Sequence, residues 1–347
     1  MDIPQGYKQT ELGIIPDDWE VKRISDFTSI ITGGTPSTLR PEYWGGNIMW
    51  MSSGELNKKF VFDVEGRITT EGLLNSSTHM IPPFCVLIGL AGQGKTRGTA
   101  AYNYISLCTN QSIAAILPND KYDSLYLYYV VDSKYDYLRL LSSGDGGRGG
   151  LNKNLLNSLE IVFPKTIAEQ RAIAEALSDI DGLIAALDKK IAKKRLIKQG
   201  AMQQLLTGKK RLPGFTDSWV EKKLGEILDY EQPQPYLVVS TDYVDSGIPV
   251  LTAGKSRILG YTTEQFGIYN KLPVIIFDDF TTDSKYISYP FKVKSSAMKV
   301  LSLKNNDYDL RLVYELMQQI DFPLKDHQRY WISEYSQLTI SIPKDRE

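Results

Sequence analysis

The chain has 347 residues, of which 42% are hydrophobic and 23% are charged, and its formal net charge is −1. This length exceeds one ordinary compact core and suits two domains of about 100–200 residues, while the near-average composition excludes collagen-like, disordered and disulfide-scaffold proteins. The two cysteines, Cys85 and Cys108, and the two histidines, His79 and His327, which lie about 250 positions apart, form no ligand cluster for a structural zinc. The net charge argues against a protein that holds nucleic acid by bulk positive charge alone.

The N-terminus shows no basic region followed by an apolar run, so it does not have the pattern of a signal peptide. No stretch approaches the roughly 18 consecutive apolar residues that a membrane span requires. We therefore expect a cytoplasmic protein without a membrane partner.

Residues 1–165 contain many short β-rich runs separated by Gly, Pro, Asn and Ser, which predict a domain of mixed α+β character. The clearest predicted strands are residues 48–51, 85–90 and 112–117. The apolar spacing of residues 122–141 predicts a helix.

Residues 166–207 are of another kind, with no proline and only two glycines. Apolar residues recur there at alternating steps of four and three, which is a heptad seam that needs a partner helix to cover it; they are Ile173, Leu177, Ile180, Ile184, Leu187 and Ile191. Thr166 and Glu169 form a capping-box pattern and Gly208 marks the helix end, so the helix would be about 60 Å long. A long helix packed on its own domain is the alternative.

The remaining residues, 209–344, repeat the first domain. Three pairs of segments match in the same order, with separations of 200, 188 and 179 residues: 19–27 with 219–227, 83–88 with 271–276, and 159–165 with 338–344. A duplication of this kind dictates the architecture. It predicts a second α+β domain with shorter loops and a helix over residues 308–319.

Residues 89–96 satisfy the pattern of a phosphate-binding P-loop, and residues 274–279 resemble the magnesium-holding strand of an ATPase. A P-loop must open a helix, whereas the residues after Thr96 predict a turn and then a strand. The two motifs also fall at equivalent places in the two repeats, so one ATPase sheet cannot use both. A P-loop NTPase is therefore retained only as an alternative.

Residues 81–84 are similar to the Asn/Asp-Pro-Pro-Tyr/Phe loop of amino-methyltransferases, but Ile81 cannot hydrogen-bond a base amine. With two histidines in polar settings no nucleophile–base arrangement can be built. We predict neither catalytic residues nor metal ligands.

Several motifs together carry a family resemblance. In the first half they are a tryptophan at the start of the repeat, Gly33-Gly34-Thr35-Pro36-Ser37, Trp44 with Ile48-Met49-Trp50, Asn110-Gln111-Ser112-Ile113, and Pro164 followed by Glu169-Gln170 and the heptad helix that ends Leu205-Leu206-Thr207-Gly208. The second half adds Phe277-Asp278-Asp279-Phe280-Thr281 and Tyr289-Pro290-Phe291. Over nearly its whole length the chain resembles the DNA-specificity subunit of type I restriction-modification systems.

The resemblance implies two similar target-recognition domains, residues 1–165 and 209–344, separated by a long central coiled-coil-forming helix, residues 166–208. Each domain would read one half of a split double-stranded DNA target, and the chain itself would be neither a catalyst nor a cofactor-binding protein. Two modification subunits would supply adenine methylation from S-adenosylmethionine, and restriction subunits would supply cleavage driven by ATP and Mg²⁺. The host would be bacterial or archaeal.

The sequence departs from the family pattern at its end, where residues 345–347 would begin a distal helix that does not follow. We expect the exposed seam to pair with a second copy of the chain or with modification subunits. A subunit that assembles in this way but does not read DNA productively is the alternative function.

Base reading requires polar side chains on loops, with Arg or Lys directed to guanine, Asn or Gln to adenine, and Ser or Thr to either. In the first domain the predicted DNA-binding residues are Gln93, Lys95, Thr96, Arg97 and Arg148. In the second domain they are Thr252, Lys255, Ser256, Arg257, Thr281, Thr282, Ser284, Lys285 and Tyr286. Residues 189–211 also carry nine basic residues and no acid, which indicates either a solvated helix face or proximity to the DNA backbone.

Overall fold

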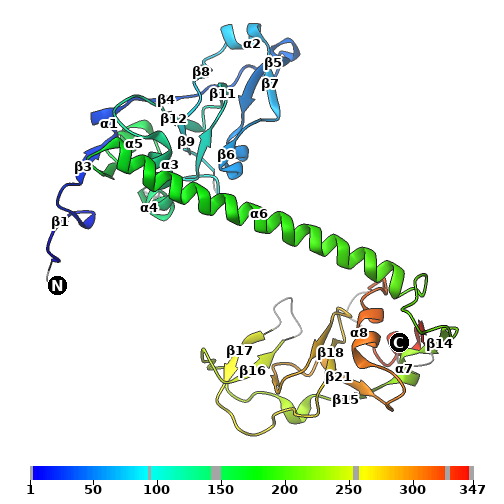
Figure 1. The fold of residues 1–347 in the computed structure, drawn as a ribbon. Helices are drawn as coiled ribbons and strands as arrows, with labels where there is room; N and C mark the ends of the chain where they lie inside the picture. The colour runs from blue at the N-terminus through cyan, green and yellow to red at the C-terminus, as the bar shows by residue number, and fades with distance from the viewer. Residues whose placement is uncertain (1–2, 93–94, 142–149, 253–257, 325–328, 344–347) are drawn as a thin grey trace. The chain divides into compact units, whose positions relative to one another are not determined.

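The computed structural model of the chain describes residues 3–92, 95–141, 150–252, 258–324 and 329–343. The chain divides into two compact units, Met1–Lys189 and Lys190–Glu347, and each is described by itself (Figure 1). Among the described residues, none of the helices combines the length and apolar character of a membrane span.

The first unit is built on a five-stranded sheet. Its strand order is β4 (Ile30–Thr32), β12 (Ile113–Ile116), β9 (Val86–Gly89), β10 (Ala100–Asn103) and β6 (Phe60–Val61), antiparallel except for the last pair. Helix α3 (Ser124–Ser133) begins at Asp123, whose carboxylate caps it, and packs on β9 and β10. All residues of β9 and β12 are buried, as expected for apolar runs covered on both faces.

A second sheet completes the first unit, in the order β7 (Gly66–Ile68), β5 (Trp44–Met51), β11 (Leu107–Thr109) and β8 (Met80–Ile81). The core has two parts, one that includes Leu127 and Val131 of α3 and one that joins Met51 and Leu107 of this sheet to Leu87 of β9. The helices α1 (Ile24–Phe27), α2 (Thr70–Leu74) and α5 (Lys153–Asn157), the hairpin β1 (Tyr7–Thr10) with β2 (Gly13–Pro16), and the ladder β3 (Glu20–Arg23) with β13 (Glu160–Phe163) lie outside the two sheets.

The helical structure predicted over residues 122–141 is confirmed, but the structure has two helices there in place of one. Helix α3 ends at Ser133; its C-cap residue Lys134 has a φ of −92° and a ψ of 15°, and α4 (Tyr135–Leu141) begins at the next residue. The break turns α4 so that Leu138 is fully buried and its Cβ lies beside Gly98. Packing against the β9–β10 connection therefore overrides the continuous helical spacing of the sequence.

Helix α6 (Ile167–Leu205) is continuous over 39 residues. The hydroxyl of Thr166 accepts from the backbone N–H of Glu169 at 3.2 Å, as the capping pattern predicts, and the carboxylate of Glu169 accepts from the indole N–H of Trp19 at 3.3 Å. At the other end Gly208 adopts φ +67° next to the ring of Trp219. Trp19 thus contacts the first turn of α6, and the equivalent Trp219 lies beside Gly208, just after the helix ends.

The second unit has a four-stranded antiparallel sheet in the order β15 (Leu228–Glu231), β21 (Met298–Leu303), β18 (Val274–Asp278) and β19 (Ser284–Ile287). A three-stranded sheet follows the order β17 (Ile258–Thr262), β16 (Ile248–Leu251) and β20 (Lys292–Val293). Strands β14 (Val220–Lys223) and β22 (Thr339–Ile342) form a ladder beside α7 (Leu224–Ile227), and α8 (Leu310–Met317) packs on β18, β19 and β22.

The two units share one topology, which confirms the predicted pair of similar α+β domains. The order β4-β12-β9-β10 corresponds to β15-β21-β18-β19, and the parallel pair β5 with β11 corresponds to β16 with β20. The register agrees as well, because Arg23 lies opposite Glu160 and Lys223 lies opposite Thr339. These are the residues that the sequence repeat aligns.

Candidate nucleic-acid interface

The P-loop-like segment is a β-hairpin connection. Strand β9 ends at Gly89, and β10 returns antiparallel to it. The N–H of Gly98 donates to the carbonyl of Gly89 at 2.9 Å, and a Cβ on Gly89 would lie 2.2 Å from the carbonyl oxygen of Thr96. The glycine therefore serves a close backbone approach, and the predicted turn followed by a strand is confirmed. The residues that follow Thr96 begin no helix that could hold a phosphate.

The ATPase-like acid of the second unit has a structural role. Asp279 is 2% exposed, and its carboxylate lies 3.3 Å from the ammonium of Lys299, which is 1% exposed. The same carboxylate accepts from the backbone N–H of Trp331 at 2.8 Å. Both oxygens are thus engaged within the protein. Strands β9 and β18 occupy equivalent positions, as the repeat predicts for the two motifs.

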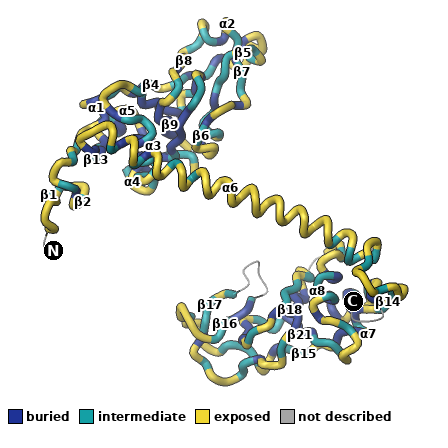
Figure 2. Tube along the Cα trace, viewed as in Figure 1, coloured by how far each residue is buried: buried dark blue, intermediate teal, exposed yellow. Residues whose placement is uncertain are grey.

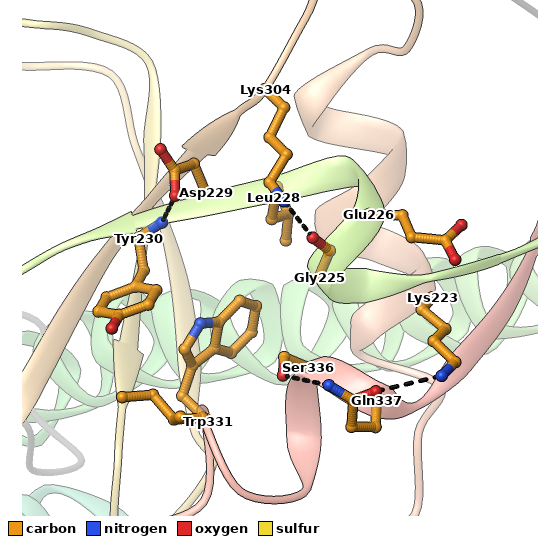
Figure 3. Close-up of a pocket in the computed structure, with 11 residues that line it drawn as sticks. Lys223, Gly225, Glu226, Leu228, Asp229, Tyr230, Lys304, Trp331, Ser336 and Gln337 are labelled. Carbon is orange, nitrogen blue, oxygen red and sulfur yellow. Dashed lines mark hydrogen bonds between the residues drawn. The ribbon is translucent and has the colours of Figure 1, made fainter.

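Trp331 borders a hollow of about 360 Å³ between α7, β15 and residues 331–337 (Figure 3). Polar groups around it bond to the protein, since Lys304 donates to the carbonyl of Gly225 at 2.5 Å and Lys223 donates to the side chain of Gln337 at 3.2 Å. Throughout the described part of the chain no group of three or more His, Cys, Asp or Glu side chains could hold a metal ion. We assign no chemistry to this hollow.

In the first domain, three of the predicted DNA-binding residues lie on the β9–β10 connection. Lys95 is exposed, while Thr96 and Arg97 are half-buried. The carbonyl of Lys95 accepts from the hydroxyls of Thr99 at 2.6 Å and Tyr135 at 3.0 Å, so α4 braces the loop. Gln93 and Arg148 lie outside the described residues.

The segment that follows Arg148 in sequence returns to the same place. The N–H of Leu151 donates to the carbonyl of Leu90, the first residue after β9, at 3.1 Å. The second unit repeats the arrangement, because the N–H of Tyr330 donates to the carbonyl of Asp279 at 3.0 Å. In each domain the end of the central strand is therefore the meeting point of the hairpin connection and a second segment of chain.

In the second domain, Thr281 and Thr282 lie on the β18–β19 connection. The hydroxyl of Thr281 donates to the carboxylate of Asp278 at 2.7 Å, and Thr282 has a φ of +59°. The ammonium of Lys285 donates to the carbonyl of Thr252 at 3.1 Å, so the structure brings these two predicted residues together. Lys255, Ser256 and Arg257 lie outside the described residues.

Ser284 and Tyr286 contact helix α8. The side-chain amide of Gln318 donates to the hydroxyl of Ser284 at 2.7 Å, and the guanidinium of Arg311 lies 4.8 Å from the ring centre of Tyr286. These contacts show intramolecular packing for both residues. Their predicted role in DNA binding stays a prediction.

Two further residues at this strand end were not among the predicted ones. Phe280 is 41% exposed, and the guanidinium of Arg329 lies 5.8 Å from the centre of its ring. Phe280 belongs to the motif Phe277-Asp278-Asp279-Phe280-Thr281. The expectation that polar side chains read base edges does not include an apolar aromatic residue. The sequence feature that indicates Phe280 is its position as a large apolar residue inside a turn, where a side chain is less easily buried in the core.

Helix α6 is exposed over most of its length (Figure 2). Of the predicted interface residues, Ile173 is half-buried and packs against the core of the first unit. The other five are between 39% and 56% exposed: Leu177, Ile180, Ile184, Leu187 and Ile191. The neighbouring Ala174 is 1% exposed and belongs to the same core. The helix therefore uses its first turns to pack on the domain and leaves the rest of the seam uncovered within this chain.

Two domains of one topology, joined by a long helix with an exposed heptad seam, define a duplicated, helix-linked protein. Residues 16–194 match the family described as type I restriction modification DNA specificity domain. Because the match covers more than half of the chain, the chain belongs to this family.

Individual relatives agree with this assignment. The chain is 51% identical over 148 residues to the EcoR124I/EcoR124II specificity subunit of Escherichia coli, which is 41% of this chain and 36% of that protein. It is 24% identical over 328 residues to the MjaVIII specificity subunit of Methanocaldococcus jannaschii, which is 91% of this chain and 70% of that protein. The alignment with the Escherichia coli protein thus spans about a third of that relative's length.

Solved structures show the same fold. The S subunit of a type I restriction-modification system from M. genitalium aligns with a TM-score of 0.66 at 16% sequence identity, over 99% of this chain and 87% of that one. A chain from a structure of type I restriction-modification complex assembly aligns with a TM-score of 0.53 at 12% identity, over 95% and 87%. The architecture of two domains and a long helix is therefore that of solved S subunits.

Proposed function

We propose that this chain is the DNA-reading subunit of a type I restriction-modification complex and that each domain recognises one half of a bipartite double-stranded target. The observation that carries the proposal is the close correspondence of strand order and register between the two domains, in a chain that belongs to the specificity family. Two similar readers on one continuous helix suit a target with two specified parts and a fixed gap.

Methyl transfer and cleavage belong, in this proposal, to partner subunits. Two modification subunits bind S-adenosylmethionine and methylate adenine, and restriction subunits use ATP and Mg²⁺. The names of the relatives support this division, because they are specificity subunits of restriction enzymes. The chain would bind no cofactor itself, and it would act in the cytoplasm of a bacterium or an archaeon.

Helix α6 serves as spacer and subunit interface. Five apolar side chains in heptad register are exposed on it, and such a seam is stable when another helix covers it. We propose that a second copy of this chain or a modification subunit supplies that helix.

The test is methylome sequencing of cells that express the chain with its modification subunits, compared with cells that lack the chain. We expect a new adenine-methylated motif in two parts with a fixed gap. Exchange of residues 1–165 for the corresponding domain of another specificity subunit should then change one half of the motif only. A one-part motif, or a change in both halves, would contradict the proposal.

The alternative is a subunit that assembles without productive DNA reading. The same experiment separates the two functions, because the alternative predicts that modification subunits co-purify with the chain while no motif is methylated. Productive reading remains our proposal because both domains have the same fully buried central strand, β9 in the first and β18 in the second.

A further inference from the structure

We propose that Phe280 is a specificity-determining residue of the second domain and that its ring contacts the methyl group of a thymine in the second half of the target. This inference rests on the proposed function and adds to it the base and the residue. It concerns the tip of the β18–β19 hairpin, residues 279–283, here called the hairpin tip.

The hairpin tip is held in one conformation by a buried carboxylate. Asp278 is 6% exposed; it accepts from the N–H of Phe280 at 3.0 Å and from the hydroxyl of Thr281 at 2.7 Å. Its own backbone bonds to Asp283 and Thr282, at 2.8 and 2.9 Å. A loop that is already ordered loses little conformational entropy when it binds. Phe280 is therefore presented in a fixed place.

A second set of contacts fixes the base of the hairpin tip. Asp279 is buried against Lys299 and accepts from the backbone of Trp331, which is itself 2% exposed. Because these groups lie in the core of the domain, the hairpin tip cannot shift without breaking a buried ion pair. Asp278 and Asp279 thus fix the backbone that carries Phe280, whose own side chain is partly exposed.

The ring of Phe280 is 41% exposed, whereas the two acids that precede it are buried. Within the hairpin tip it is the one large apolar side chain. The guanidinium of Arg329 lies 5.8 Å from its ring centre, which places a cation suited to a DNA phosphate beside it. Asp283 is exposed on the same hairpin tip and would be repelled by phosphates, so the hairpin tip suits base edges better than the backbone.

Groove geometry identifies the apolar partner. The major groove of B-DNA admits a two-stranded β-ribbon, and the apolar group that it displays is the C5 methyl of thymine. The equivalent connection in the first domain, residues 90–99, has no aromatic residue. The contact should therefore affect the second half of the target and not the first.

The first experiment selects binding sites from random-sequence duplexes with the full chain in complex with its modification subunits. We expect Phe280→Ala to lose base preference at one A·T pair of the second half and to keep the first half unchanged, while Phe280→Leu keeps part of that preference. Leu259→Ala is the matched control, since Leu259 of β17 is 44% exposed in the same domain. It should select the same sequence as the unaltered chain.

The second experiment replaces the thymine of that pair by deoxyuridine, which removes only the methyl group. The unaltered complex should bind the uridine duplex about fourfold more weakly, as burial of one methyl group predicts, and the Phe280→Ala complex should bind both duplexes equally. Unchanged preference in Phe280→Ala, a uniform weakening over both halves, an affected pair that is G·C, or an equal uridine effect in the variant would each overturn the inference. If the unaltered complex selects no two-part sequence, the proposed function itself fails.

Discussion

At the scale of residues, the two domains share one fold but have different side chains at equivalent buried positions. In the second domain Lys299 and Asp279 form a buried ion pair, whereas the strand register places Ile113 of the first domain at the position of Lys299. A buried pair of charges is weak support for stability, but removal of one partner leaves an uncompensated charge in the core. The pair is best understood as a device that fixes the position of the β18–β19 hairpin.

Asp279→Asn should therefore destabilise the second domain by about 3–5 kcal/mol. Asp279→Asn combined with Lys299→Met should recover much of that stability, because no unpaired charge remains. Urea unfolding of the full chain, followed by tryptophan fluorescence, measures both effects, and Asp283→Asn at an exposed position is the control, with an expected change within about 0.5 kcal/mol. Equal unfolding midpoints for Asp279→Asn and the control would contradict this role.

Glu264 provides a prediction on pH. A hydrogen bond from the buried ammonium of Lys292, at 2.7 Å, together with the backbone N–H groups of Ser240 and Val239, lowers the pKa of Glu264 below its ordinary value. Because the folded pKa is the lower one, the stabilisation is present above the unfolded value, which is about 4.3, and is lost as the pH falls through the folded value.

Glu264→Gln should flatten this acid limb. Urea midpoints measured from pH 7 down to about pH 3 should fall less steeply for the variant than for the unaltered chain. Glu221→Gln, on an exposed position of β14, serves as the control. A variant that loses stability toward acid as steeply as the unaltered chain would show that Glu264 does not contribute in this way.

At the scale of elements, helix α6 combines two roles along one sequence. Its first turns carry Gln170 and Ala174, which are 4% and 1% exposed, and the side chain of Gln170 bonds to Pro164 and Asp123 of the first unit. Further along, the apolar seam is exposed. Both predicted behaviours, packing on its own domain and presenting a seam, thus occur in different parts of the helix.

Ile184→Lys should abolish association through the seam, because it places a charge at a position that a partner helix must cover. Ala186→Lys, exposed on another face of α6, should leave association unchanged. Light scattering at micromolar concentration, for the chain alone and with modification subunits, measures the result. If the unaltered chain is monomeric and also fails to bind modification subunits, the proposal that the seam is a subunit interface is wrong.

At the scale of the whole molecule, the net charge of −1 means that DNA phosphates cannot be neutralised by an overall positive charge of the chain. Basic residues are concentrated on the exposed second half of α6: Lys189, Lys190, Lys193, Lys194 and Arg195. Phosphate contacts give binding a salt dependence that grows with their number. Neighbouring subunits can share this neutralisation, so we expect the complex to show a steeper salt dependence than the chain alone.

Replacement of the four lysines of this run by glutamine should reduce the slope of log affinity against log salt by about 0.9 for each phosphate that the variant no longer neutralises. Replacement by arginine at the same positions should preserve the slope. Fluorescence anisotropy titrations between about 50 and 200 mM salt measure it. An unchanged slope in the glutamine variant would identify the run as a solvated helix face.

The repeat, the fold class and the central helix could be predicted from sequence because they rest on local signals. Apolar runs of strand length became β9 and β18, and heptad spacing with Thr166 and Gly208 at its ends became α6. In each strand and helix, residue spacing alone decides which side chains share a face, and the repeat follows from the preserved order of the matching segments.

Other features arise only when distant residues meet. The bond between Asp279 and Trp331, the contact of Lys285 with Thr252, and the separation of α3 from α4 all depend on packing across the domain. The exposure of Phe280 has the same origin, because only the tertiary structure decides that Asp278 and Asp279 turn inward and the ring that follows them turns outward. The sequence pattern determined the architecture; the three-dimensional contacts decided which side chains remain available for binding.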